Sequence, residues 1–285
     1  MRRFSGAAAA LLLLTAACTA RIDEASLVHP IKAGALDPAT LTGNAARFTA
    51  EQHWIERPDG ARLHAVLLRQ PGAKATILYF GGNGYTIGQF GAWTAQSFAL
   101  LPANLMIVDH RGYGLSTGTA ALSSGEADGL AAFDYLRRLT PGPIIVHGHS
   151  IGSFVAGHVA ANRDTAGAVL ESSATTTEEW VASRTGGITG KLVRVKIDPA
   201  LAGRGNAANV KRIDEPLLIV VGGKDKTTPS ILSQHLYDAS PLPAGRKQIV
   251  IVPQADHNNV MIARTVHAAY AKLIAEVTGS SPSSE

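Results

Sequence analysis

A serine between two glycines is the residue of this sequence best placed for nucleophilic chemistry. The stretch at 146–152 reads Val-His-Gly-His-Ser-Ile-Gly, with Ser150 at its fifth position. It follows an apolar, β-branched run at 144–146 and precedes a segment at 153–161 whose small residues are typical of a packed helix. A sharp strand-to-helix turn needs glycine on both sides of the serine, because a side chain at either position would clash. Ser150 is therefore predicted to present an exposed hydroxyl.

Two further residues are candidates to activate this hydroxyl. A serine is a poor nucleophile until a base takes its proton, and the base must be oriented by an acceptor. His257 is the best candidate base, because it lies between the last predicted strand and the last helix, and Asp225 is the best acceptor, because its loop follows the preceding core strand. Asp214 and Asp238 are rival acids, but neither follows the end of a strand. The predicted chemistry is acyl transfer through Ser150.

Alternating strands and helices must position these residues. Strand-like runs occur at 75–80, 104–108, 144–146, 166–170, 216–221 and 247–252, with helical segments between and after them at 89–100, 123–139, 153–161, 230–238 and 260–277. An antiparallel hairpin is predicted before them, at 48–56 and 62–69, around the turn signal Arg-Pro-Asp-Gly. This alternation predicts a mostly parallel central sheet of about eight strands with helices on both faces. Residues that follow the strands should meet at the sheet's carboxyl edge.

The order of these motifs resembles the α/β-hydrolase family, in which nucleophile, acid and base follow one another as Ser, Asp and His. The stretch at 109–116, Asp-His-Arg-Gly-Tyr-Gly-Leu-Ser, resembles the D-x-R-G-x-G-x-S motif of the family's esterase, lipase and S33-peptidase branch. The resemblance runs from about residue 48 to 277. It implies the α/β-hydrolase fold and a serine hydrolase that needs no cofactor.

The resemblance also implies where a tetrahedral intermediate would be stabilised. Phe-Gly-Gly-Asn at 80–83 corresponds to an H-G-N-type loop after the third strand, with Gly81 in place of the usual histidine. The backbone N–H groups of Asn83 and Ile151 would form the oxyanion hole. Replacement of the usual histidine by Gly81 could change the rigidity of this loop, but it leaves the two backbone N–H groups in place.

Other residues near these motifs have less direct expected roles. Asp109 and Arg111 are expected to stabilise the loop around Gly112 and Gly114 rather than to act in catalysis. The residues expected to line the substrate pocket are Tyr85, His149 and Trp180.

The chain is expected to form one domain with flanking segments. Residues 48–277 would form the hydrolase domain, in which 174–210 is a short lid insertion with few long apolar runs. Because such an insertion can roof little of a pocket, a shallow, water-accessible site is expected. Residues 18–47 show no clear periodicity and are interpreted as a tether, and the Ser-rich tail at 278–285 is expected to be disordered.

The first residues indicate export. Residues 1–17 combine a basic start with an apolar stretch too short to span a bilayer, as a signal peptide does. Leu-Thr-Ala-Ala-Cys at 14–18 resembles a bacterial lipoprotein lipobox, with Thr15 where leucine is usual. This implies cleavage before Cys18 and lipidation of its thiol, and an ordinary signal peptide cut nearby is the alternative. The expected location is the bacterial cell envelope, with a lipid anchor as the membrane contact.

Composition excludes several other classes of site. The net charge is +4, and it falls to +2 (24 basic minus 22 acidic residues) without Arg2 and Arg3. The basic residues are scattered, so no nucleic-acid site is expected. Cys18 is the single cysteine, which excludes an internal disulfide, and no group of His, Asp and Glu has metal-ligand spacing.

The sequence thus predicts a serine hydrolase that cleaves a small-molecule carboxylic ester or thioester. A peptidase or an acyltransferase would use the same three residues, so both alternatives stay open at this stage. A non-catalytic, membrane-tethered binding protein on a hydrolase scaffold is an alternative of a different class.

Overall fold

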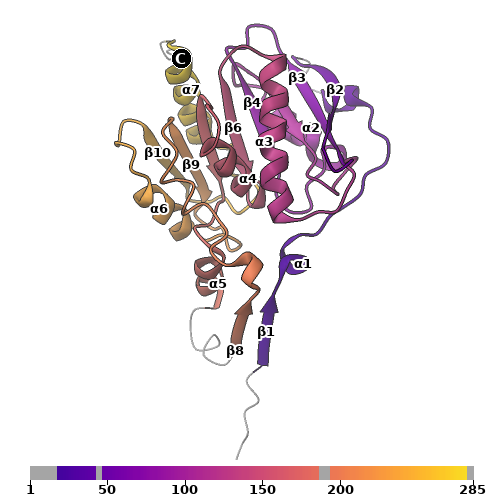
Figure 1. Ribbon diagram of the computed structural model, residues 1–285. Helices are drawn as coiled ribbons and strands as arrows, with labels where there is room; N and C mark the ends of the chain where they lie inside the picture. Colours follow the sequence, from indigo (N-terminus) through magenta and orange to yellow (C-terminus); the bar gives the residue numbers. More distant parts are fainter. Residues whose placement is uncertain (1–17, 43–46, 186–192, 281–285) are drawn as a thin grey trace, which may run out of the picture.

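A computed structural model describes residues 18–42, 47–185 and 193–280, and it contains an eight-stranded sheet between two layers of helices (Figure 1). The strands are β2 (Thr49–Glu56), β3 (Arg62–Arg69), β4 (Ala75–Phe80), β5 (Ala103–Val108), β6 (Ile144–His149), β7 (Gly167–Glu171), β9 (Leu217–Gly222) and β10 (Lys247–Val252). Their order across the sheet is β10-β9-β7-β6-β4-β5-β3-β2. All neighbours from β10 to β5 pair in parallel, while the β2–β3 hairpin joins β5 in the antiparallel sense. The predicted mostly parallel sheet is confirmed.

Helices cover both faces of this sheet. They are α2 (Ile87–Phe98), α3 (Leu122–Leu139), α4 (Ile151–Ala160), α6 (Ser230–Ala239) and α7 (Arg264–Thr278). The apolar core has two halves: α2 and α7 pack on one face, and α3, α4 and α6 pack on the other. Successive side chains of a strand point to opposite faces. In β4, accordingly, Ile77 and Tyr79 belong to the first half of the core, and Leu78 and Phe80 belong to the second.

A buried polar network holds the 109–116 motif at the end of β5. Asp109 accepts hydrogen bonds from His64 Nδ1 at 2.8 Å and from the N–H of Ile87 at 2.8 Å. The guanidinium of Arg111 donates two hydrogen bonds, each 2.7 Å long, to the buried carboxylate of Asp128. Asp109 and Arg111 therefore stabilise the loop, which is the structural role that the sequence suggested for them.

The segment before the hairpin contacts the rest of the domain through polar side chains, through backbone hydrogen bonds of Ile31 and Ala33 with Gly114, and through the buried side chain of Leu41. It contains β1 (Cys18–Ile22) and the short helix α1 (Glu24–Leu27). Glu24 accepts a hydrogen bond from the N–H of Leu122, the first residue of α3, at 2.5 Å. The ammonium group of Lys32 donates to the carbonyl of Ser116 at 2.9 Å. The sequence pattern suggested only a tether here, because contacts made by single, scattered residues leave no periodic signal.

The predicted lid insertion carries α5 (Thr177–Thr185) and β8 (Val193–Ile197). β8 pairs in parallel with β1, and Arg21 of β1 forms an ion pair of 2.8 Å with Asp198 just after β8. Figure 1 shows α5, β8 and β1 together at the end of the molecule opposite the C-terminus. Residues 186–192 of the insertion lie outside the described residues, as do the predicted signal segment at 1–17 and residues 281–285 of the tail.

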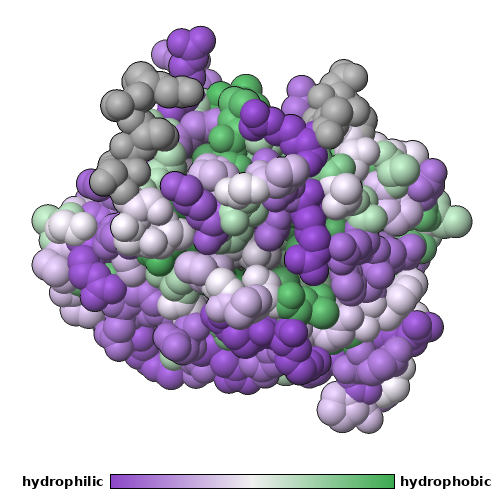
Figure 2. Space-filling model, turned by 90° about the horizontal axis from the view of Figure 1, so that it is seen from above, coloured by the Kyte–Doolittle hydropathy of each residue, from purple (hydrophilic) through white to green (hydrophobic). Residues whose placement is uncertain are grey.

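The end of the molecule where the C-terminus lies is mostly hydrophilic. Figure 2 looks onto this end and shows apolar residues only in small, separate patches. Among the described residues, no helix has the length and apolar character needed to cross a bilayer. The residues predicted to do chemistry lie at the other end, where the parallel strands terminate.

Candidate active site

Ser150 occupies the sharp turn between β6 and α4. Its backbone has φ 53° and ψ −121°, a combination that a residue with a side chain rarely adopts. The turn depends on its flanking glycines: a Cβ atom at Gly148 would lie 2.1 Å from the carbonyl oxygen of Gly152, and one at Gly152 would lie 2.2 Å from that of Phe80. The structure thus has the strained geometry that the sequence predicted at Ser150.

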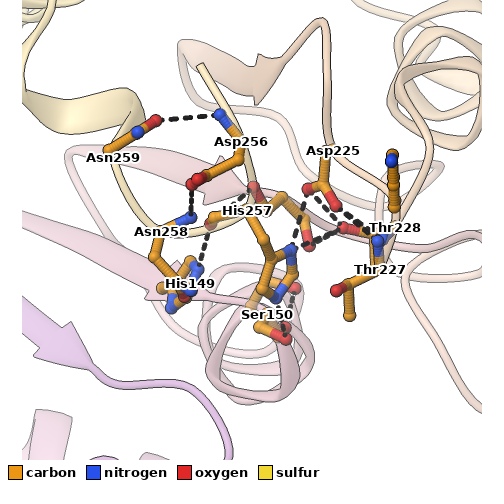
Figure 3. Close-up of polar contacts among 12 residues, drawn as sticks. His149, Ser150, Asp225, Thr227, Thr228, Asp256, His257, Asn258 and Asn259 are labelled. Carbon is orange, nitrogen blue, oxygen red and sulfur yellow. Dashed lines mark hydrogen bonds and ion pairs between the residues drawn. The ribbon is translucent and has the colours of Figure 1, made fainter.

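Ser150, His257 and Asp225 are brought together from three separate loops (Figure 3). The Nε2 atom of His257 lies 3.0 Å from Ser150 Oγ, and its Nδ1 atom lies 2.8 Å from Asp225 Oδ2. A proton on Nδ1 donates to the carboxylate and leaves the Nε2 lone pair facing the serine hydroxyl. This is the arrangement in which an imidazole accepts a serine proton.

The carboxylate of Asp225 is buried but fully hydrogen-bonded. Asp225 is 6% exposed, and its Oδ1 atom accepts hydrogen bonds from the N–H groups of Thr227 and Thr228, both at 2.8 Å. Burial by itself would raise the pKa of Asp225, but the hydrogen bond and charge of His257 and the donors of Thr228 together lower it. The side chain is therefore an ionised acceptor for His257.

Thr228 is a contact of this site that sequence reasoning missed. Its Oγ1 atom lies 2.9 Å from Asp225 Oδ2, 3.2 Å from His257 Nδ1 and 2.9 Å from the carbonyl oxygen of Ser172. The hydroxyl thus links the acid and the base to the end of β7. The sequence carried no signal for it beyond its position three residues after Asp225.

His149 lies beside the candidate base rather than in the pocket of Ser150. Its Nε2 atom donates to the carbonyl oxygen of His257 at 2.8 Å, and the two rings are 4.9 Å apart. Burial lowers the pKa of His149, and the neutral ring that this favours can make the hydrogen bond when its proton is on Nε2. His149, predicted as a substrate contact, therefore also holds the backbone of His257 in place.

The side chain of Asn83 fixes the loop after β4. Its Oδ1 atom accepts from the N–H of His29 at 2.9 Å and from the hydroxyl of Tyr113 at 2.8 Å, while its Nδ2 atom lies 2.8 Å from the ring of His29. Gly81 is required at its position, because a Cβ atom there would lie 2.2 Å from the ring of Tyr85. The glycine that replaces the usual histidine thus makes room for an aromatic ring, and the loop is held by Asn83.

Two backbone N–H groups at this loop and at the turn are free to bind a ligand. Within the described residues, neither the N–H of Asn83 nor that of Ile151 donates to a protein acceptor. Ile151 is the first residue of α4, where helix geometry leaves N–H groups unpaired and favours negative charge. Both residues line the same cavity as Ser150.

The cavity in front of Ser150 has a volume of about 170 Å³. Residues that line it include Leu27, Asn83, Ser150, Ile151, Phe154 and Trp180. The indole N–H of Trp180 donates to the carbonyl of Thr227 at 2.8 Å, so the ring is fixed at the cavity wall. Tyr85 lines a different cavity, together with His149. In the described part of the chain, no three His, Cys, Asp or Glu side chains are placed to hold a metal ion.

Comparison with known proteins agrees with the fold described above. The family model described as serine aminopeptidase, S33, matches residues 71–198. In three dimensions, an esterase of Pyrococcus furiosus superposes with a TM-score of 0.66 at 16% identity, covering 89% of this chain and 97% of that one. The chain has the α/β-hydrolase fold.

Two further proteins are similar to this chain, one in sequence and one in structure. Protein bem46 of Schizosaccharomyces pombe is 25% identical over 247 residues, which cover 83% of this chain and 81% of the relative. An acylaminoacyl peptidase of Pyrococcus horikoshii superposes with a TM-score of 0.57 at 16% identity, covering 80% of this chain and 41% of the peptidase. The fold is thus shared by an esterase and a peptidase, and the substrate must be argued from the site.

The hydrogen bond between Asp225 and His257 generates the first prediction. Replacing Asp225 with asparagine places an amide against Nδ1 and favours the wrong tautomer of His257, so kcat should fall by about 10⁴-fold. The measurement is hydrolysis of a p-nitrophenyl ester by the purified variant. Asp214→Asn and Asp238→Asn are matched controls, because both residues are exposed and neither lines the cavities at the site, and they should retain the rate. If Asp225→Asn kept the wild-type kcat while Asp214→Asn or Asp238→Asn lost activity, Asp225 would not be the orienting acid.

Proposed function

We propose that this hydrolase cleaves carboxylic esters or thioesters through an acyl-enzyme on Ser150. The observation that carries the proposal is the alignment of Ser150, His257 and Asp225, at 3.0 and 2.8 Å, beside a cavity lined by the free N–H groups of Asn83 and Ile151. Nucleophile, base, orienting acid and oxyanion donors are the parts that acyl transfer requires.

In the first half of the reaction, Ser150 Oγ attacks the carbonyl carbon while its proton passes to Nε2 of His257. The carbonyl oxygen becomes an oxyanion, which the N–H groups of Asn83 and Ile151 stabilise by hydrogen bonds. When the intermediate collapses, the bond to the leaving oxygen or sulfur breaks, and this atom takes the proton from His257. Asp225 stabilises the imidazolium while it carries the proton.

In the second half, water attacks the acyl group on Ser150 and gives its proton to His257. The second tetrahedral intermediate uses the same two N–H groups. Its collapse breaks the bond to Ser150 Oγ, which regains its proton from His257, and the carboxylic acid is released. No redox partner or cofactor takes part in this balance.

Three alternatives use the same scaffold. A peptidase would expel an amine instead of an alcohol, and the S33 family match and the peptidase neighbour make it the second candidate. An acyltransferase would replace the water of the second half with another nucleophile. A binding protein would leave Ser150 unreactive. The proposal favours esters because the esterase of Pyrococcus furiosus superposes on 89% of this chain and matches 97% of its own length.

The nucleophile is tested by deleting one hydroxyl. Ser150→Ala should lower kcat by about 10⁴-fold or more, with the residual rate coming from binding and the oxyanion hole. A fluorophosphonate probe should label the wild-type protein and a Ser124→Ala control, and it should not label Ser150→Ala. Wild-type-like rates in Ser150→Ala would refute the assignment, and an unlabelled wild-type protein would favour the binding protein.

The size of the cavity predicts the preferred acyl chain. A cavity of about 150 Å³ accommodates one benzene ring, and the cavity at Ser150 is of similar size, about 170 Å³. Acyl chains of roughly two to eight carbons should therefore give the highest kcat/KM, and longer chains should gain far less than about 0.8 kcal/mol per methylene. A p-nitrophenyl ester series below micellar concentrations measures this. A kcat/KM that rises through long chains would contradict the prediction and indicate a lipase.

We further propose that Cys18 carries a lipid that anchors the protein in the bacterial cell envelope, at the periplasmic or outer-membrane face. The support is the lipobox-like sequence at 14–18. Wild-type protein should incorporate an alkyne-tagged fatty acid and sediment with membranes, whereas Cys18→Ser should do neither. Thr19→Ser is the matched control and should behave as the wild type. A mature N-terminus beyond residue 18 would exclude the anchor.

A further inference from the structure

A second, larger cavity of about 600 Å³ adjoins the candidate active site and has no role in the mechanism above. Asn83 lines both cavities, and a Cβ atom at Gly82 would lie 2.8 Å from His149 Nδ1 and 3.3 Å from the Cβ atom of Ser150. In Figure 3, His149 and Asn258, which line the larger cavity, lie on one side of Ser150, and Asp225 and Thr228 lie on the other. A substrate bound at Ser150 can therefore extend past His149 into this space.

A carboxylate forms part of the wall of the larger cavity. Glu171, the last residue of β7, is 2% exposed and pairs across the strands with His149, so both side chains point to the same face of the sheet. Its Oε2 atom accepts from His147 Nε2 at 3.0 Å. Among the described residues, no donor reaches its Oε1 atom. Oε1 is not among the fully buried side-chain atoms that lack a partner, and Glu171 lines the cavity, so a ligand in the cavity can donate to this oxygen.

The surroundings of Glu171 favour its ionised form. Burial by itself would raise the pKa of Glu171, but the neighbouring imidazoles of His149 and His147, the latter through its hydrogen bond, together lower it. The neighbouring hydroxyls of Tyr79 and Tyr270 have raised pKa values, because both are buried and both lie near this carboxylate. Lysine and arginine are absent from the described residues that line the cavity. The cavity therefore contains a negative charge with no cationic side chain of its own.

Aromatic side chains form much of the remaining wall. Tyr79 and Tyr85 lie deep in the cavity, while Phe90 and Trp93 of α2 are 39% and 42% exposed at its mouth. The rings of Tyr85 and Phe90 stack with their centroids 5.7 Å apart. Aromatic faces attract cations, and they bind organic ammonium groups better than inorganic ions because they also contact the carbon atoms.

We propose that the larger cavity binds a protonated amine carried by the substrate, with Glu171 as its counter-ion and Trp93 and Phe90 covering its carbon atoms. The inference rests on the proposed ester hydrolysis at Ser150 and adds a substrate class to it, namely esters with a basic nitrogen a few atoms from the carbonyl. The amine can belong to the alcohol or to the acyl part, since both extend from the same carbonyl carbon.

The experiment compares esters that differ only in charge. For the alcohol side, 2-(dimethylamino)ethyl butyrate is compared with 3-methylbutyl butyrate. For the acyl side, ethyl 4-aminobutyrate is compared with ethyl pentanoate. At neutral pH we expect kcat/KM to be about tenfold or more higher for the amine in one of the pairs, and that pair identifies the side that enters the cavity. Ratios near one in both pairs would overturn the proposal.

Two variants and a control assign the preference to the cavity. Glu171→Gln should reduce the amine-to-neutral ratio to about one, because it removes the charge but keeps the shape. Trp93→Leu, on the exposed face of α2, should lower the ratio without depending on the folding of a buried site. Glu276→Gln, an exposed carboxylate on α7, should leave both the ratio and the rates unchanged. A preference that survives in Glu171→Gln and Trp93→Leu would overturn the proposal.

A binding measurement separates this proposal from the proposed catalysis. Benzylammonium and benzyl alcohol have nearly the same shape, and calorimetry with Ser150→Ala protein needs no turnover. We expect benzylammonium to bind at least about tenfold more tightly and to lose this advantage when Glu171→Gln is combined with Ser150→Ala. Equal affinities would refute the amine site, whereas a preference for benzylammonium in a protein that hydrolyses no ester would refute only the ester proposal.

Discussion

The close approach of α4 to the end of β4 is the contact on which the candidate site depends. At Gly152 the two backbones are so near that a Cβ atom would lie 2.2 Å from the carbonyl oxygen of Phe80. This approach holds Ser150 in its rare conformation and brings the N–H of Ile151 to the same cavity as that of Asn83. Strain of this kind persists only where the surrounding packing fixes the backbone. The apolar core on both faces of the sheet supplies that packing.

Two buried carboxylates near the site differ in how their oxygens are used. Asp225 receives donors on both oxygens, from Thr227, Thr228 and His257, so it has a fixed structural partner for each. Glu171 receives a donor from His147 on one oxygen, and its other oxygen is without a donor among the described residues. The two donor-bound oxygens of Asp225 suit an acid that orients His257, whereas Oε1 of Glu171 can still accept a hydrogen bond from a ligand. His149 lines the larger cavity and donates a hydrogen bond to the backbone of His257.

The sheet and the elbow could be predicted because their signals are local. Apolar runs such as 75–80 mark buried strands, and the glycines around Ser150 mark the turn. Asp225 and His257 were found because they follow strands, whose carboxyl ends must meet. Thr228 and Glu171 gave no such signal, since their contacts depend on which face each side chain occupies. The N-terminal contacts to Asn83 join residues 54 positions apart, which no periodicity can reveal.

The parallel pairing of β1 with β8 has a consequence for orientation. The five residues of β1 span roughly 16 Å and lie with β8 and α5 at the end of the molecule where the parallel strands terminate (Figure 1). Any attachment at residue 18 would therefore act through this paired strand, which limits rotation about the point of attachment. A surface bound there would face the mouths of the cavities, and the hydrophilic end in Figure 2 would point away from it. Substrates diffusing along that surface would then reach Ser150 by a two-dimensional search.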